Sequence, residues 1–322
     1  MISIVIPSHK SEKTIVQTIK SVLNQDYKGK YEIIVVDSFL GKTPELIKKF
    51  PVRLIRQKQA GPAAARNLGA MKAKGDIIVF LDADCIAPKH WLRVLLEPFS
   101  NNNVAAVAGS YKVWNKESLV ARFTDYEIAE RHEYMRKLDS IDWVGSYNCA
   151  YRKNIFFKFY GFDTKMIQAE DGELSLRISK DHMIVFQHKA YVYHHYPDRL
   201  KSYLKMRFWR GYWKIFLFSK HKRKTLKNVY TPRTVWIQAL ALGFSIIFFL
   251  FGLFVFHGLF FSISLFLFLF MYVCNTQFFI FLWKKEKKMI LPSLVLILLR
   301  DLTALIGISF GTAKLIIRKF IR

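Results

Sequence analysis

The chain has 322 residues, of which 52% are hydrophobic and 16% aromatic, and 50 Lys and Arg against 24 Asp and Glu give a formal net charge of +26. This much apolar sequence excludes an intrinsically disordered protein. The three cysteines, Cys85, Cys149 and Cys274, are far apart and form no CxxC pair, which excludes a disulfide scaffold and a thiolate zinc site.

The N-terminal part alternates short apolar strands with helices. Nearly continuous apolar runs predict strands at residues 2–7, 31–37, 52–56 and 76–81. The segments between them predict helices at residues 11–25, 44–50 and 61–73. Short buried strands joined by helices are typical of a mainly parallel sheet that is covered on both faces. We therefore expect an α/β, Rossmann-like domain over residues 1–198.

A basic stretch follows at residues 199–233, with twelve Lys or Arg, no acid and several interleaved aromatic residues. Such a stretch can bind nucleic acid. Because this one adjoins a hydrophobic segment, the favoured interpretation is an interfacial helix that faces anionic lipid. We expect an anionic membrane surface as its partner and no nucleic acid.

The remaining residues, 234–322, are predicted to form a membrane domain. The segments 235–256 and 258–283 contain no charged residue, and each exceeds the ~20 residues that cross a bilayer. Basic residues flank both outer ends, so the positive-inside rule places these ends in the cytoplasm and the turn near His257 outside. A third apolar segment, 289–313, contains Arg300 and Asp301, and the sequence leaves open whether it crosses, re-enters or lies in the interface.

The first apolar stretch, residues 2–6, is too short for a cleavable signal peptide and has no basic region before it. We therefore expect the N-terminal domain to stay on the cytoplasmic side of an integral membrane protein.

Polar residues follow the predicted strands, where ligands of such sheets bind. Asp37 ends the second strand, and Asp82 and Asp84 follow the fourth. The chain has neither GxGxxG after its first strand nor a P-loop motif, so a phosphate ligand would need another charge partner. Two carboxylates at i and i+2 of an extended segment share one face and can hold Mg²⁺ or Mn²⁺ against a diphosphate. In isolation, however, such a pair is more often a solvated turn.

Taken in order, the motifs resemble those of family 2 glycosyltransferases of the GT-A fold that carry C-terminal transmembrane segments. The matching stretches cover residues 1–195: SIVIPSHKSEKTIVQTIKSVLNQ, EIIVVDS, GPAAARNLGA, GDIIVFLDADC, GSYNCAYRK, GFD and AEDGELSLRI. The chain departs from the family in having a single acid after the second strand, and His9 and Lys10 where an aromatic residue and Asn are frequent. The Q-x-x-R-W motif of processive synthases is absent.

The resemblance implies roles on the donor side. The loop that holds the nucleoside in the family contains Pro7, His9 and Glu12 in this chain. Asp37 resembles the acid that hydrogen-bonds the base, and Arg66 lies in the helix that approaches the nucleotide.

The resemblance also implies a pair of metal-binding acids and a loop on the acceptor side. Asp82 and Asp84 resemble the DxD motif, with Asp84 as the direct metal ligand and Asp82 nearer the ribose or a metal-bound water. Gly145, Ser146 and Asn148 resemble the loop on the acceptor side.

Asp171, preceded by Glu170, resembles the catalytic base. An acceptor hydroxyl must lose its proton as it attacks the anomeric carbon, and a carboxylate can take it; an acceptor phosphate would only need to be positioned. Arg207 and Arg210 can neutralise the leaving diphosphate together with the metal. The alternatives are an ordinary acid at a helix N-terminus for Asp171 and contacts with lipid headgroups for the two arginines.

These features predict a membrane-bound inverting glycosyltransferase of glycolipid or cell-envelope polysaccharide synthesis. Its donor would be a nucleoside-diphosphate sugar, its cofactor Mg²⁺ or Mn²⁺, and its acceptor a polyprenyl phosphate or a lipid-linked saccharide. A polysaccharide synthase and a non-catalytic nucleotide-sugar-binding protein remain as alternatives. His188, His194 and His195 could suggest a metal cluster, but they are interpreted as surface or interface residues, because no acid with ligand spacing accompanies them.

Overall fold

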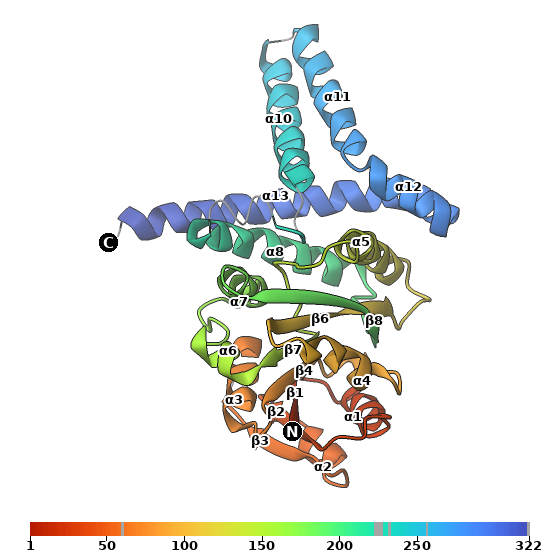
Figure 1. Ribbon diagram of the computed structural model, residues 1–322. Helices are drawn as coiled ribbons and strands as arrows, with labels where there is room; N and C mark the ends of the chain where they lie inside the picture. The colour runs from red at the N-terminus through yellow and green to blue at the C-terminus, as the bar shows by residue number, and fades with distance from the viewer. Residues whose placement is uncertain (59–60, 222–227, 231–232, 256, 321–322) are drawn as a thin grey trace. The chain divides into compact units, whose positions relative to one another are not determined.

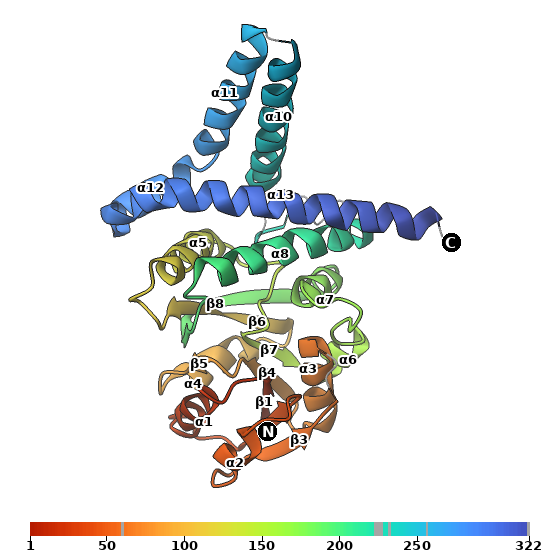
Figure 2. The same ribbon diagram turned by 180° about the vertical axis from the view of Figure 1, so that it is seen from behind.

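The computed structural model describes residues 1–58, 61–221, 228–230, 233–255 and 257–320 (Figures 1 and 2). The chain divides into two compact units. The first comprises Met1–Lys116 and Arg131–Tyr196, and the second comprises Glu117–Glu130 and Pro197–Arg322. The second unit therefore includes a segment from within the N-terminal domain that the sequence predicts.

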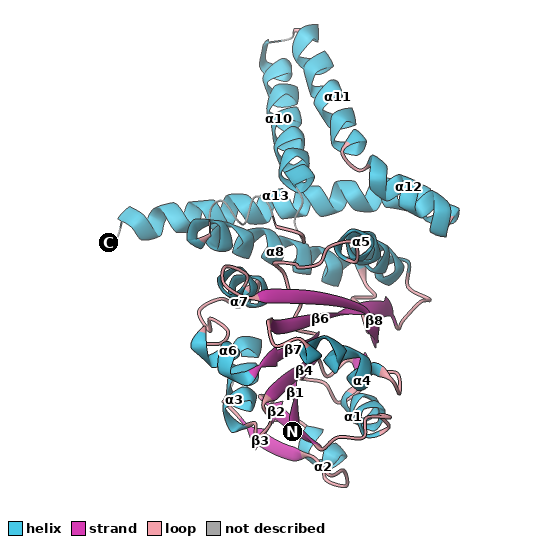
Figure 3. Cartoon of the chain, in the orientation of Figure 1, coloured by secondary structure: helices cyan, strands magenta, loops and turns pink. Residues whose placement is uncertain are grey.

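The first unit is built on a sheet of eight strands in the described residues (Figure 3). They are β1 Ile2–Ser8, β2 Tyr31–Asp37, β3 Arg53–Arg56, β4 Ile77–Leu81, β5 Cys85–Ile86, β6 Val104–Val113, β7 Asn148–Arg152 and β8 Met183–His194. Their order is β3-β2-β1-β4-β7-β6-β8-β5. The first four neighbours are parallel, whereas β7 is antiparallel to both β4 and β6. The predicted α/β, Rossmann-like domain is confirmed, with a mixed second half to its sheet.

Helices cover both sides of this sheet. They are α1 Ile15–Leu23, α2 Thr43–Ile47, α3 Gly61–Lys72, α4 Trp91–Leu96, a 3₁₀ turn at Glu97–Ser100, α6 Lys153–Lys158 and α7 Glu170–Ile178. In both views, α3 and α6 lie on one side of the sheet and α1 and α4 on the other. In α1, the buried Ile15, Ile19 and Val22 recur at helical spacing and form its inner face. The helix starts at Ile15, four residues later than predicted, because residues 12–14 form a turn.

The helix α3 lies unusually close to β1 at Gly69. A Cβ atom placed on Gly69 would collide with the side chain of Val5 and lie 3.2 Å from Cγ2 of Val36. Only glycine therefore allows this helix, which carries Arg66, to lie so near the sheet.

The second unit consists of helices. They are α5 Leu119–Met135 as far as Glu130, α8 Leu200–Lys220, α10 Arg233–Val255, α11 Gly258–Val273, α12 Thr276–Lys285, a 3₁₀ turn at Lys287–Met289 and α13 Ile290–Phe320. The helix α8 lies in the predicted basic linker, whose residues 222–227 and 231–232 are outside the described residues. Within the described residues, Thr234–Val255 and Lys287–Arg318 are long and apolar enough to cross a membrane.

The segment 258–283, predicted as one span, is bent, and its two parts together are apolar enough for one broken span. It forms two helices, α11 and α12, that are bent by 46° at Cys274 and Asn275. The side-chain amide of Asn275 donates to the carbonyl of Met271 at 2.9 Å, and its oxygen accepts from Arg300 at 3.2 Å. Because these bonds compete with the regular helical pattern, they account for a break that hydropathy alone did not indicate.

Replacing Gly69 tests the close packing of α3. Gly69→Val is expected to lower the free energy of unfolding by about 1–3 kcal/mol, because the added side chain overpacks the helix against Val5. Met71→Val introduces the same residue at an exposed position of the same helix and serves as the control. Thermal unfolding of the purified protein in detergent measures both, and equal losses in the two variants would contradict the close-packing explanation.

Candidate functional site

The acidic pair Asp82 and Asp84 follows β4 in a loop that is fixed by main-chain hydrogen bonds. The amide of Asp82 donates to the carbonyl of Tyr147 at 3.1 Å, and the carbonyl of Asp84 accepts from the amide of His195 at 3.1 Å. The side chain of Asp84 is 42% exposed, and its buried Oδ1 forms no hydrogen bond among the described residues, with Nε2 of His194 3.4 Å away. A buried carboxylate oxygen in this state is suited to receive a cation.

A buried arginine joins this pair to a second pair of acids. Arg66 of α3 forms an ion pair with Asp82 through Nη2 at 2.7 Å and with Glu170 through Nη1 at 3.0 Å. Its side chain is only 4% exposed. Residues 82 and 170, which are far apart in sequence, are thereby held in one site.

The predicted base, Asp171, lies in the first turn of α7, where main-chain amides orient its carboxylate. Its Oδ1 accepts from the amide of Gly172 at 2.7 Å, and its Oδ2 accepts from the amide of Ser146 at 3.4 Å. The hydroxyl of Ser175 donates to the carbonyl of Asp171 at 2.6 Å and accepts from the amide of Val144 at 3.0 Å. The loop 144–146 and the start of α7 are therefore bound to each other directly.

The backbone around this turn is also constrained. Ala169, which precedes the acidic pair, adopts a left-handed conformation with φ of 64°, which is strained for a residue other than glycine. A Cβ atom on Gly172 would collide with the indole of Trp143. These contacts fix the point at which α7 begins and hence the position of Asp171.

The acids of the site differ in the direction of their pKa shifts. Burial and repulsion from Asp171 raise the pKa of Glu170 to about 8, against the attraction of Arg66. Burial and the neighbouring Asp84 raise the pKa of Asp82, although Arg66 opposes the shift. Burial alone would also raise the pKa of Asp84, but the imidazole of His194 keeps it below its ordinary value. Glu170 therefore holds its proton more tightly than an ordinary glutamate, whereas Asp84 releases its proton more readily.

His194 lies in this site, contrary to its interpretation as a surface residue. Its Nε2 is 3.4 Å from Oδ1 of Asp84, and possible ligand atoms of Asp84, Cys85 and His194 lie within 4.8 Å of one another. The antiparallel pairing of β5 with β8 places Cys85 opposite His194, a register that the sequence does not reveal. Because burial raises the pKa of Cys85 well above its ordinary value, its sulfur stays a thiol and is a poor ligand. One imidazole and carboxylates fit Mn²⁺ well, and carboxylates alone also fit Mg²⁺.

A second group of polar atoms lies at the ends of the neighbouring strands β1, β2 and β3. Asp37 is fully buried and forms an ion pair with Arg56, a residue that sequence reasoning missed. Oδ1 of Asp37, Oγ of Ser8 and Oε1 of Gln57 are buried and, among the described residues, have no hydrogen-bond partner. Such atoms are what a bound nucleoside would satisfy.

The remaining predicted donor residues surround this edge. Pro7 is half-buried in the last part of β1, and His9 is exposed, with its Nδ1 3.3 Å from Oγ of Ser38 and its ring 5.4 Å from that of Phe39. The carboxylate of Glu12 lies against Gly41 in the loop after β2.

The predicted acceptor loop divides into two parts. The carbonyl of Gly145 accepts from the hydroxyl of Tyr111 at 3.3 Å, next to Ser146. Asn148, in contrast, is fully buried, and its amide contacts three other elements: it donates to Ser110 and Ala190 and accepts from Trp91, all at 2.8–2.9 Å. Asn148 therefore braces the sheet, because both N–H groups of its side chain and one lone pair of its oxygen are used within the fold.

Arg207 and Arg210 belong to the second unit, in α8. Arg207 is buried and donates to Glu127, so its charge is already compensated. A contact between Arg207 and a diphosphate would first require this ion pair to open.

Part of the chain matches a known family and is similar to known proteins. Residues 3–159 match the family described as glycosyl transferase family 2. The chain is 29% identical over 225 residues to the probable glycosyltransferase YdaM of Bacillus subtilis (strain 168). The aligned region covers 64% of this chain and 53% of YdaM, so the chain spans about half the length of this relative. It is 28% identical over 188 residues to the UDP-Glc:alpha-D-GlcNAc-diphosphoundecaprenol beta-1,3-glucosyltransferase WfgD of Escherichia coli, with 57% of this chain and 72% of WfgD covered.

A solved structure has the same fold. The mannosyltransferase PcManGT from Pyrobaculum calidifontis, in complex with GDP-Man and Mn²⁺, superimposes with a TM-score of 0.57 at 20% identity. The superposition covers 71% of this chain and 67% of PcManGT. The expected GT-A architecture is thus confirmed.

Glu170 makes the stability of the fold depend on pH. Its pKa is about 8 in the folded protein, against 4.5 as the ordinary value. The folded state holds the proton more tightly, so the stabilising contribution is complete below the unfolded pKa and is lost as the pH rises through the folded pKa. Because Gln cannot ionise, the unfolding temperature of Glu170→Gln relative to the unchanged protein is expected to rise from pH 5 to about pH 8.

Thermal unfolding at the two pH values measures this difference. Glu117→Gln, at an exposed position, serves as the control, and its difference should stay constant. A difference that is also constant for Glu170→Gln would show that its pKa is not raised.

Proposed function

The chain belongs to glycosyltransferase family 2 through its N-terminal domain, and we propose from this premise that it transfers a sugar from a nucleoside-diphosphate sugar to a membrane-associated acceptor. The observation that carries the proposal is the ion-paired Arg66, which brings the DxD pair and the acids of α7 into one site. Transfer from an activated diphosphate requires a pair of metal-binding acids beside a correctly oriented carboxylate.

The donor nucleoside would bind at the ends of β1 and β2. Asp37, Ser8 and Gln57 offer buried polar atoms there that lack partners among the described residues. Arg56 would hold Asp37 in place for the base, while Pro7, His9 and Glu12 would line the loop in front of it.

Asp84 and His194, with Asp82 beside them, would hold a divalent cation. Once bound, Mn²⁺ or Mg²⁺ supplies positive charge for the diphosphate that leaves. The low pKa of Asp84 keeps its carboxylate ionised and ready for this role, while Arg66 compensates Asp82.

Asp171 would accept the proton of the acceptor hydroxyl. The amides of Gly172 and Ser146 hold its carboxylate in one orientation, while the carboxylate of Glu170 is occupied by Arg66. Attack on the anomeric carbon from the side opposite to the leaving diphosphate gives inversion in a single displacement. If the acceptor is a phosphate, Asp171 would position it instead.

The acceptor that we propose is lipid-linked and lies at the cytoplasmic face. The apolar helices of the second unit and the basic residues that flank them support a membrane location with the catalytic domain inside. The name of WfgD states a diphosphoundecaprenol-linked acceptor, which supports the same chemical class for this chain.

Removal of the base tests the mechanism. Asp171→Asn is expected to reduce transfer by about 10²–10⁴-fold while donor binding persists, because the amide cannot accept the proton. Membranes that carry the protein are incubated with labelled nucleotide sugars and Mn²⁺ or Mg²⁺, and label is followed into the organic-extractable lipid. Asp181→Asn, at an exposed position after α7, is the control.

The outcomes of this assay discriminate between the functions. Label in lipid that depends on Asp171 supports the proposal. Label in a polymer would indicate a polysaccharide synthase, and binding without turnover by the unchanged protein would indicate a non-catalytic role. Near-normal transfer by Asp171→Asn would rule out Asp171 as the base.

Loss of His194 tests the metal site. His194→Ala is expected to weaken Mn²⁺ binding by about 10-fold or more, because changes even to outer partners of a metal cost this much. Electron paramagnetic resonance of free Mn²⁺ measures binding without turnover. His188→Ala, an exposed histidine of the same strand, should bind normally. Equal binding by both variants would exclude His194 from the site.

A further inference from the structure

We propose that α13 lies in the plane of the membrane at its cytoplasmic interface, paired with α8, and does not cross the bilayer. In length and composition α13 passes as a membrane span, so the inference rests on what surrounds it. It concerns the second unit alone and does not depend on the proposed activity.

The first observation is that α13 has two unlike faces. Large apolar residues are exposed on one face, among them Leu291, Val295, Ile306 and Phe310 at 44–75% exposure. The opposite face carries Arg300 and the small residues that contact α8. In α10, by contrast, exposed apolar residues recur all round the outer part of the helix. One-sided apolarity is typical of an interfacial helix, and all-round apolarity of a span.

The second observation is the close packing of α13 on α8. A Cβ atom on Gly211 would collide with the carbonyl of Ala304, and one on Gly307 would collide with that of Phe208. A Cβ atom on Gly311 would lie 2.6 Å from the carbonyl of Tyr212. The two backbones therefore touch over several turns of helix.

This contact fixes the depth of α13. The helix α8 contains Lys201, Lys205, Arg207, Arg210, Lys214 and Lys220 and no acid. Such a helix does not enter the hydrocarbon core. Because the guanidinium of Arg318 lies 5.4 Å from the ring of Phe216, the pairing continues towards the end of α13. The second half of α13 is thus held at the depth of α8.

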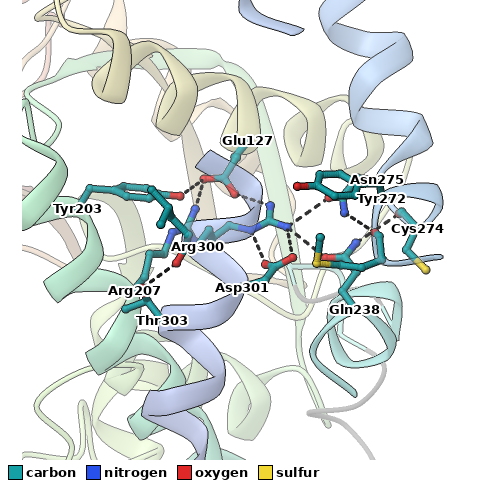
Figure 4. Close-up of polar contacts among 12 residues, drawn as sticks. Glu127, Tyr203, Arg207, Gln238, Tyr272, Cys274, Asn275, Arg300, Asp301 and Thr303 are labelled. Atoms are coloured by element: carbon teal, nitrogen blue, oxygen red, sulfur yellow. Dashed lines mark hydrogen bonds and ion pairs between the residues drawn. The ribbon is translucent and has the colours of Figure 1, made fainter. Parts of the chain in front are cut away.

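The third observation is a buried polar cluster at the middle of α13 (Figure 4). Nη1 of Arg300 donates to Glu127 of α5 at 2.9 Å, and Glu127 also accepts from Arg207. Nε of Arg300 donates to Asp301 at 2.6 Å, and Nη2 donates to Asn275 at 3.2 Å. The charges at positions 300 and 301, which are costly in lipid, are therefore surrounded by protein.

The start of α13 is bound to the same part of α5. Glu286, just before α13, accepts from Arg122 at 2.6 Å and from the hydroxyl of Tyr126 at 2.7 Å. Residues 286 and 300 thus both contact the first part of α5, residues 119–130, which is rich in charge. If α13 crossed the bilayer, this charged segment would have to follow it inwards.

The apolar hairpin, α10 and α11, sets the direction of α13 relative to the bilayer. The helices α10 and α11 run side by side and stand steeply on α13 in both views (Figures 1 and 2). When α10 crosses the bilayer, α13 consequently lies along its surface. Its apolar face then meets acyl chains, while the lysines of α8 and Lys314 of α13 meet anionic headgroups.

Cysteine labelling of the full-length protein tests the topology. Single cysteines are introduced at Arg318 near the end of α13, at Lys287 before it and at Gly258 in the hairpin turn. Intact cells are treated with a membrane-impermeant maleimide before and after permeabilisation, with the unchanged protein as blank. We expect Gly258→Cys to react in intact cells, and Lys287→Cys and Arg318→Cys to react only after permeabilisation. Reaction of Arg318→Cys in intact cells would overturn the proposal.

A depth measurement excludes a re-entrant path, which would also leave residue 318 inside. Nitroxide labels are placed at Phe310→Cys on α13 and at Phe249→Cys within α10, both at exposed positions. Relaxation by oxygen and by a water-soluble nickel complex in liposomes with anionic lipid reports depth. The label at residue 310 is expected to be lipid-exposed but shallower than that at residue 249. Equal depth would refute the interfacial position, and Ile306→Cys repeats the test if Phe310→Cys does not fold.

Discussion

The site depends on one interaction, the buried guanidinium of Arg66 between Asp82 and Glu170. Without it, carboxylates from a strand end and from the start of α7 would repel each other in a place that water scarcely reaches. Removing one partner of a buried ion pair commonly costs about 3–5 kcal/mol. The close approach of α3 at Gly69 puts the arginine where both acids can reach it. The site thus depends on a residue that takes no part in the proposed proton transfer.

Buried arginines are paired with an acid in the second unit as well, where Glu127 accepts hydrogen bonds from both Arg207 and Arg300. In each case, the charge is tolerated because acids and amides from separate elements converge on it. The two arginines of the second unit therefore hold helices together, whereas Arg66 holds the acids of the candidate site together. A buried arginine in such a chain does not by itself mark a phosphate site.

Local patterns in the sequence predicted much of this structure. The strands, the acidic pair after β4 and the apolar hairpin follow from periodicity and composition, which report local exposure. The pairing of Asp37 with Arg56 and of Asp84 with His194 did not follow, because each depends on strand register. The hydrogen bonds of Asn148 and Asn275 did not follow for a related reason: what a buried amide does depends on which carbonyls the fold brings to it. Hydropathy likewise could not distinguish α13 from a span, since it averages over the two faces of a helix.

The bracing by Asn148 has a mechanical consequence for the first unit. From β7, this side chain donates to a carbonyl of β6 and to that of Ala190 in β8. It also accepts a hydrogen bond from the indole of Trp91 in α4. The strand β7 joins the parallel half of the sheet to the mixed half. Three side-chain hydrogen bonds at this junction oppose shearing of one half of the sheet against the other. Closure over two substrates would then fall to the loops beyond the strands, with the sheet as a stationary base.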